Sequence, residues 1–170
     1  AVDEIISEFF AVENPYLGIY SKADGIHLRV IARAKDTATA RTMIAPVEKA
    51  IHERLGEYVW GYDDDTPEQA AGKSLMERGL SVAVMEMCTG GALANNITDN
   101  PNSVSYFKGG NVAYDGAALK SCGVPGEVME KHGVVSQETA NAMAEAVRRH
   151  LNADVGIAVT GVPGPGEFEG

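Results

Sequence analysis

The stretch LSVAVMEMCTGGALANNI, residues 80–97, decides the fold of the longer part of this chain. Residues 81–85 are apolar without polar alternation after Ser81, which is typical of a buried strand of a parallel sheet. The Gly-rich turn Thr89-Gly90-Gly91 comes next, and residues 92–97 look helical. A strand, a Gly-rich turn and a helix in this order point backbone N–H groups at an anion. The stretch therefore predicts an α/β domain with a ligand site after its first strand.

Strand and helix patterns alternate along the sequence around this stretch. The predicted elements are a helix over 66–78 with a capping box at its start, an extended segment over 106–114, a helix over 137–150 and a strand over 155–159. The last strand leads into a second Gly-rich segment, TGVPGPG at 160–166. This alternation predicts a largely parallel sheet, whose ligands bind outside the carboxyl ends of the strands. Both Gly-rich segments could then face one pocket; two ordinary tight turns are the alternative.

Residues 1–61 have the patterns of a separate, small α+β domain. The alternation over 26–32 predicts a strand that forms a hairpin with residues 16–20. Apolar spacing over 40–55 predicts an amphipathic helix, and residues 58–60 suggest a closing strand.

An acidic linker separates this domain from the rest of the chain. Residues 62–65 read YDDD, and adjacent aspartates repel one another and prefer water. The domains we predict are therefore a small α+β accessory domain over 1–61, a linker over 62–65 and an α/β domain over 66–170.

Composition narrows the classes of function. The formal net charge of −10 argues against a surface for nucleic-acid phosphates. Cys88 and Cys122 form no Cys-x-x-Cys pair, so no zinc or redox signature is present. The sequence shows neither an apolar run near membrane-spanning length nor a leader pattern. We expect a soluble cytoplasmic protein without a membrane partner, a metal or another cofactor.

Five segments, in order, resemble the C-terminal amidase domain of the CinA family. EMCTGG at 86–91 differs at one position from that family's Glu-Ser-Cys-Thr-Gly-Gly. The other four are SVSYFKGG at 103–110, VAY at 112–114, HGVVS at 132–136 and TGVPGPG at 160–166. The resemblance covers roughly the first two-thirds of the family domain. It implies an incomplete α/β domain, from a fragment or from a chain that another subunit completes.

Residues 1–61 resemble the small middle domain of CinA proteins, which has been described as KH-like. The matching residues are Asn14-Pro15, HLR at 27–29, APVE at 45–48 and RLG at 54–56. This region contains no Gly-x-x-Gly loop, and the chain is acidic. We therefore expect a scaffold or homo-oligomer contact here and no RNA binding.

The resemblance implies a reaction, the hydrolysis of the carboxamide of nicotinamide mononucleotide to nicotinic acid mononucleotide and ammonia. The family is thought to use the Ser before Cys-Thr-Gly-Gly as nucleophile, with a Tyr and a Lys as proton-transfer groups. Tyr114 matches the Tyr. The residues that the resemblance assigns to substrate or phosphate binding are Thr89, Gly90, Gly91, Thr160 and Gly161.

The sequence departs from the family at both other catalytic positions. Met87 stands at the nucleophile position, and a thioether has no proton to lose. Leu119 stands at the Lys position when counted from the Tyr, and Lys120 is next; counting back from Gly123 gives Ala118 instead. One step along a helix turns a side chain by ~100°.

Cys88 is the alternative nucleophile because it begins a helix, although adjacent side chains at a strand end point different ways.

Three hypotheses follow. The chain is an impaired amidase relative that keeps a pocket for a pyridine mononucleotide. It is an active amidase in which Lys120 and Tyr114 activate water or Cys88. Or it is a non-catalytic nucleotide-binding or assembly module.

Overall fold

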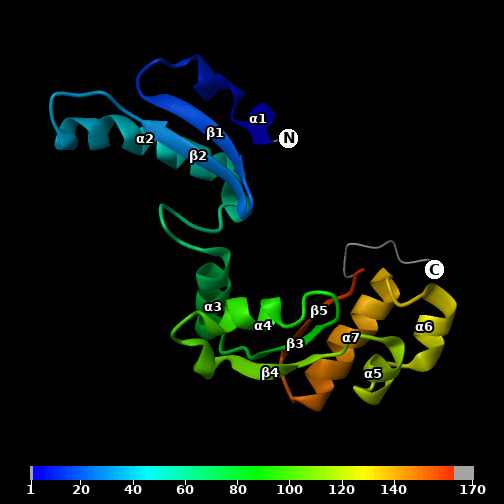
Figure 1. Cartoon of the computed structure of the whole chain (residues 1–170). Coiled ribbons are helices and arrows are strands. Elements are labelled where there is room, and N and C mark those ends of the chain that lie inside the picture. Colours follow the sequence, from blue (N-terminus) through cyan, green and yellow to red (C-terminus); the bar gives the residue numbers. More distant parts are fainter. Residues whose placement is uncertain (1, 163–170) are drawn as a thin grey trace. The chain divides into compact units, whose positions relative to one another are not determined.

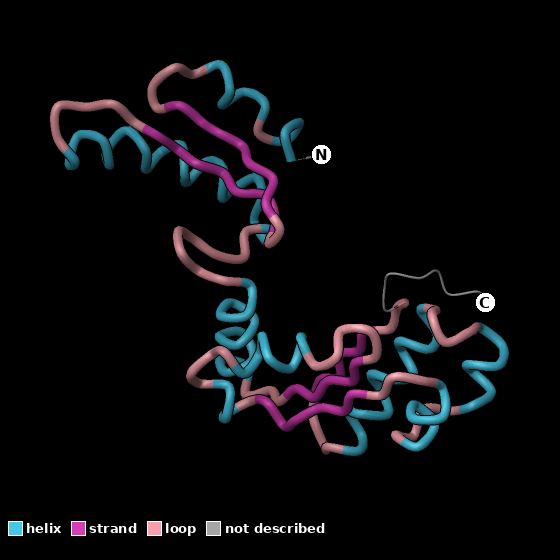
Figure 2. Tube along the Cα trace, viewed as in Figure 1, coloured by secondary structure: helices cyan, strands magenta, loops and turns pink. Residues whose placement is uncertain are grey.

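The computed structural model describes residues 2–162, and the chain divides into two compact units, Ala1–Pro67 and Glu68–Gly170 (Figures 1 and 2). The TGVPGPG segment therefore lies within the described residues only up to Val162. Among the described residues, no helix is long and apolar enough to cross a membrane.

The first unit is an antiparallel hairpin with helices packed on it. Its elements are α1 (Val2–Ile5), the 3-10 helix η1 (Ser7–Ala11), β1 (Tyr16–Lys22), β2 (Gly25–Ile31), α2 (Thr37–Leu55) and the 3-10 helix η2 (Gly56–Tyr58). The buried core consists of Ile6, Leu17, Ile51 and Leu55. The predicted hairpin and helix are confirmed, and α2 runs through Pro46 after an N-cap at Asp36.

The predicted closing strand at residues 58–60 is wrong. Gly56 leaves α2 with a φ of 45°, and the N–H of Val59 donates to the carbonyl of Gly56 at 3.1 Å. The N–H of Val59 is therefore used within a local 3-10 turn and does not donate to a neighbouring strand, as it would in a sheet. The sheet described in this unit has two strands, β1 and β2.

The second unit is a three-stranded parallel sheet with helices around it (Figure 1). Its elements are α3 (Pro67–Arg78), β3 (Val82–Glu86), α4 (Ala92–Thr98), the 3-10 helix η3 (Ser103–Ser105), β4 (Phe107–Val112), α5 (Gly116–Ser121), α6 (Gly126–His132), α7 (Gln137–His150) and β5 (Val155–Val159). The strand order is β4-β3-β5, so the strand of the opening stretch is central. The predicted α/β class with a parallel sheet is confirmed.

The two faces of β3 are buried against different elements. Ala83, Met85 and Met87 join the apolar cluster that includes Met143 and Val147 of α7. The alternate residues Val82, Val84 and Glu86 point to the opposite face, and all three are fully buried. Complete burial on both faces explains why the strand is apolar in an unbroken run.

Close packing of α7 on the sheet depends on a glycine in β5. A Cβ at Gly156 would overlap the backbone carbonyl of Ala144. The helix begins at Gln137 after an N-cap at Ser136, whose hydroxyl accepts from the N–H of Thr139. The cap and the glycine together fix where α7 lies, and this placement defines one wall of the candidate site.

Candidate functional site

The segments that follow the three parallel strands meet at one edge of the sheet. The N–H of Met87 donates to the carbonyl of Val159 at 3.0 Å, and the N–H of Ala113 donates to the carbonyl of Glu86 at 2.8 Å. These bonds continue both ladders one residue past β3 and β4. The edge thus brings together the starts of the segments that follow β3, β4 and β5, as expected for a parallel sheet.

Met87 is buried at this edge beside Thr160. The side chain of Met87 is 4% exposed, and its Sδ lies 3.6 Å from the Oγ1 of Thr160. The Thr160 hydroxyl also donates to the carbonyl of Val134 at 2.8 Å. Because a hydroxyl has one proton and a thioether is a weak acceptor, the carbonyl is the main partner. Thr160, which belongs to the final turn segment, therefore contacts both the EMCTGG and the HGVVS segments.

Cys88 lies beside the second Gly-rich turn. A Cβ at Gly161 would lie 2.9 Å from the Sγ of Cys88, so the absence of a side chain at Gly161 makes room for the thiol. Cys88 is half-buried and outside the apolar cluster that contains Met87. The interactions described for residues 2–162 include no hydrogen bond from the Cys88 thiol to Tyr114 or Lys120.

Glu86 organises the first Gly-rich turn, a role that the sequence analysis missed. Its side chain is fully buried. The Thr89 hydroxyl donates to its Oε2 at 2.6 Å, and the N–H groups of Leu93 and Ala94 donate to its two oxygens at 2.8 Å each. The Glu86 carboxylate therefore binds the N-terminus of α4. The signal was a lone acidic residue at the end of an apolar strand, just before a Gly-rich turn and a helix.

The carboxylate of Glu86 stays ionised despite its burial. Burial raises the pKa of Glu86, but hydrogen bonds from Thr89, Ala94, Leu93 and Gly91 outweigh burial and bring the pKa below its usual value of 4.5. This arrangement changes the expected role of the turn. The Thr89 hydroxyl and the first free N–H groups of α4, which we expected to face a ligand phosphate, already bind an internal anion.

Tyr114 and Lys120 lie on the rim of the unit. Tyr114 is 56% exposed. Lys120 is also exposed, and its ammonium lies against Gly126 at the start of α6. Leu119 is fully buried and belongs to the same apolar cluster as Met87. No hydrogen bond or ion pair described within residues 2–162 joins Tyr114 or Lys120 to Met87.

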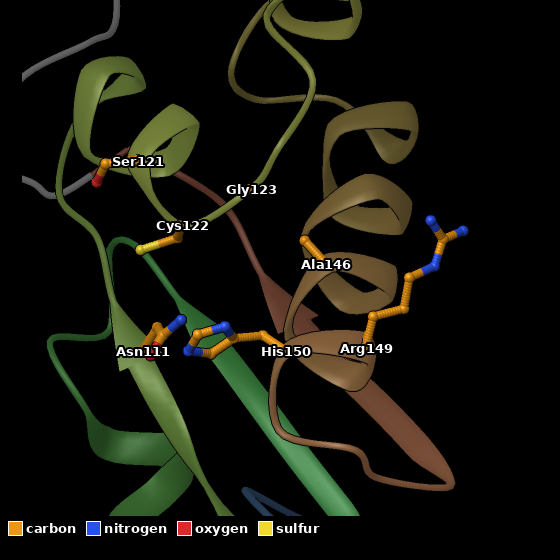
Figure 3. A pocket seen from close by; sticks show the side chains of 7 residues that line it. All are labelled: Asn111, Ser121, Cys122, Gly123, Ala146, Arg149 and His150. Carbon is orange, nitrogen blue, oxygen red and sulfur yellow. The ribbon is translucent and has the colours of Figure 1, made fainter.

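A separate pocket of ≈ 480 Å³ lies near the C-terminal end of α7 (Figure 3). Its lining residues are Asn111, Ser121, Cys122, Gly123, Ala146, Arg149 and His150. It includes none of the site residues selected from the sequence. Within residues 2–162, no group of three His, Cys, Asp or Glu side chains is arranged to hold a metal ion.

Fold and site together define the class: a parallel α/β domain, preceded by a small α+β unit, whose two Gly-rich turns meet at the carboxyl edge of the sheet. Comparison with known proteins names the family. Residues 64–170 match the CinA C-terminal domain, and residues 1–61 match the damage-inducible protein CinA KH domain. The chain belongs to the CinA family, as the sequence resemblance predicted.

Relatives and solved structures agree with this assignment. The chain is 43% identical over 166 residues to a putative competence-damage inducible protein of Desulforudis audaxviator, and 45% identical over 166 residues to one of Moorella thermoacetica. Each match covers 97% of this chain and 40% of the relative, so the chain spans about two-fifths of these proteins.

Among solved structures, a competence/damage inducible protein from Agrobacterium tumefaciens is 33% identical with a TM-score of 0.56, over 59% of this chain and 61% of that one. A CinA superfamily protein from Escherichia coli is 28% identical with a TM-score of 0.58, over 68% of this chain and 70% of that one.

Proposed function

We propose that this chain is an impaired nicotinamide-nucleotide amidase of the CinA type. It binds a pyridine mononucleotide in the cytoplasm at the carboxyl edge of its sheet, and it hydrolyses the carboxamide poorly or not at all. The observation that supports this proposal most is the contact between Met87 and Thr160. Met87, which cannot act as a nucleophile, stands at the family's nucleophile position and contacts Thr160 of the final turn segment.

The chemistry of amide hydrolysis explains why two positions matter. The amide carbonyl needs an attacking hydroxyl whose proton a nearby base removes. A thioether at position 87 offers no such proton. The family Lys falls at Leu119 when counted from the Tyr and at Ala118 when counted back from Gly123, and a hydrocarbon side chain at either position accepts no proton. The exposed position of Lys120 argues against the rearranged active centre that would use it.

Ammonia release from nicotinamide mononucleotide tests the proposal. We expect the parent chain to be silent, Met87→Ser to gain weak activity, and Met87→Ser with Leu119→Lys to gain more, because a lysine at the buried position 119 loses its proton readily. Met85→Ser is the matched control, since it places the same side chain on the same face of β3, one step deeper. Ammonia release by the parent chain at the rate of the doubly repaired variant would contradict the proposal.

A second candidate function, assembly, is supported by the surface of the first unit. Several large apolar or aromatic side chains there are at least 40% exposed: Tyr16, Tyr20, Ile26, Ile31, Tyr58 and Trp60. Tyr16 and Ile31 are direct cross-strand neighbours in the hairpin, and contiguous exposed apolar surface marks interaction sites. Under this proposal the chain forms a homo-oligomer through residues 1–61. Sedimentation should show an oligomer for the whole chain and a monomer for a variant with Tyr16 and Ile31 changed to Ser; a parent chain that sediments as a monomer contradicts it.

A further inference from the structure

We infer that the pocket near the C-terminal end of α7 is a covalent binding site for a small disulfide, with Cys122 as the nucleophile and His150 as the base that takes its proton. The pocket has a volume of ≈ 480 Å³, within the usual range of about 300–1,000 Å³ for small-molecule sites. Three polar side chains line it from three elements: Asn111 of β4, Cys122 at the end of α5 and His150 of α7. Neither Met87 nor Thr160 lines it, so it is separate from the candidate site.

The backbone around Cys122 holds the thiol at the wall of the pocket. The N–H of Cys122 donates to the carbonyls of Ala118 and Leu119 at 3.0 and 3.1 Å, which closes the last turn of α5. Gly123 follows with a φ of 90°, a left-handed conformation that favours glycine, and a Cβ there would lie 3.9 Å from that of Ala146 on α7. Cys122 is a free, half-buried cysteine, so its sulfur is held by the fold and still borders the pocket.

The groups that can act on a ligand are the ones with free side chains. The Cys122 thiol, the Asn111 amide and the His150 ring point into the space that they line, and no hydrogen bond described within residues 2–162 uses any of them (Figure 3). The Ser121 hydroxyl already donates to a backbone carbonyl of α5 at 2.7 Å. The Arg149 guanidinium is paired with a carboxylate of its own helix and points away from the pocket (Figure 3). Cys122 is therefore the available nucleophile among the lining residues.

The surroundings of the thiol favour exchange with a disulfide over attack on a carbonyl. Attack on a carbonyl creates an oxyanion, which needs free N–H donors beside the nucleophile. The N–H groups of Cys122 and Gly123 both donate to carbonyls of α5, so neither is free. In thiol–disulfide exchange the charge stays on sulfur, and no such donors are needed.

The step balances without a further oxidant. His150 takes the thiol proton, directly or through one water, and the Cys122 sulfur attacks one sulfur of the disulfide. The S–S bond breaks, and the leaving thiolate takes the proton back from His150. The products are a mixed disulfide on Cys122 and one free thiol. The amide of Asn111, which offers both a donor and an acceptor, is placed to bind a polar group of the attached half.

The chain contains its own matched control, the second cysteine. Cys88 is also free and half-buried, but it does not line the pocket. Its sulfur is crowded by the second Gly-rich turn, because a Cβ at Gly161 would lie 2.9 Å from it. Because access limits the rate of exchange, a small disulfide should react with Cys122 before Cys88.

Peptide mass spectrometry of the whole chain after reaction with 2-hydroxyethyl disulfide, and separately with oxidised glutathione, tests this selectivity. The first reagent is uncharged and the second is anionic, and none of the lining residues is acidic. We expect the adduct to form on Cys122 about tenfold faster than on Cys88 with both reagents. Equal or faster modification of Cys88 overturns the inference, and this measurement needs no variant that has to fold.

A variant of His150 tests the base. His150→Gln should slow the reaction of Cys122 with 2-hydroxyethyl disulfide about tenfold at neutral pH and leave the reaction of Cys88 unchanged. Arg149→Gln is the matched control, since it removes a charge at the adjacent position and should change neither rate. A variant that only loosened the fold would expose Cys122 and speed its reaction. An unchanged or faster rate for His150→Gln, or equal slowing by Arg149→Gln, overturns the inference.

Discussion

Glu86 and Met87 are adjacent in the chain, yet they belong to regions with opposite chemistry. Glu86 points to one face of the sheet, where its carboxylate binds the Thr89 hydroxyl and the start of α4. Met87 points to the other face and lies in the apolar cluster under α7. On this polar face, the hydroxyl and N–H donors of the turn and of α4 already have an internal acceptor, the Glu86 carboxylate. On the other face, the Met87 side chain is surrounded by apolar neighbours. The comparison teaches that two neighbouring residues are held by different parts of the unit, Glu86 by the turn before α4 and Met87 by the apolar cluster.

The largest effect should come from breaking the polar face. Glu86→Ala leaves the Thr89 hydroxyl and two backbone N–H groups without an acceptor, and it should lower the free energy of unfolding by about 3–5 kcal/mol, measured by urea denaturation. Thr89→Val is the control, because it removes one charge-assisted bond, worth about 1.5–3 kcal/mol. A loss for Glu86→Ala no larger than that for Thr89→Val would mean that the carboxylate does not organise the turn.

Breaking the apolar face should cost less at its edge than at its centre. Met87→Ala should lower the free energy of unfolding by about 2 kcal/mol, and Met85→Ala by about 3 kcal/mol, since a closed site collapses less easily than one that opens at an edge. Urea denaturation of both variants measures the difference. The reverse order would show that position 87 is the better enclosed of the two.

Acid should weaken the polar face selectively. Because folding lowers the pKa of Glu86 below its ordinary 4.5, its ionised form stabilises the fold fully above pH 4.5, and this contribution is lost as the pH falls from 4.5 toward the folded-state pKa. The free energy of unfolding of the parent chain should therefore approach that of Glu86→Gln between pH 5 and pH 3, an interval of about two units around the ordinary value.

The Glu86→Gln comparison also removes other acid effects. Hydrogen bonds from Arg148 and Arg149 bring the pKa of Glu145 to about 2, and this contribution is common to both proteins. A constant difference between the two proteins across this range would contradict the assigned pKa shift of Glu86.

The smallest effect should come from Lys120, which belongs to neither face. Its ammonium is exposed against Gly126, so Lys120→Ala should change the free energy of unfolding by no more than about 0.5 kcal/mol. It should also leave any ammonia release by Met87→Ser unchanged. A loss of that activity would assign Lys120 a part in proton transfer that its position in the fold argues against.

Much of the fold could be predicted from patterns that span a few residues. The Thr66-Pro67-Glu68-Gln69 sequence at the start of α3, the Ser136 cap of α7 and the apolar run Val82 to Met85 of β3 each specify an element through a few consecutive residues. The prediction of a closing strand at 58–60 was wrong, because apolar residues alone do not distinguish a strand from the turn that Gly56 begins.

The candidate site could be predicted only in part. Met87 and Thr160 each directly follow a strand, and they reach the same edge of the sheet because parallel strands end together. The role of Glu86 could not be read from the sequence, since its partners Leu93 and Ala94 lie beyond a turn of unknown geometry. Nor could the choice between Leu119 and Lys120, because both fit the same short helix and only packing against the sheet decides which one is buried.

The sequence by itself determined the family and the α/β class, because motifs and strand periods are local properties of the chain. The tertiary structure alone decided which way each side chain points. Glu86 binds the α4 turn, Met87 fills the apolar edge, and Lys120 stays outside. These outcomes depend on contacts between distant segments, whose free energies cannot be read from either segment alone.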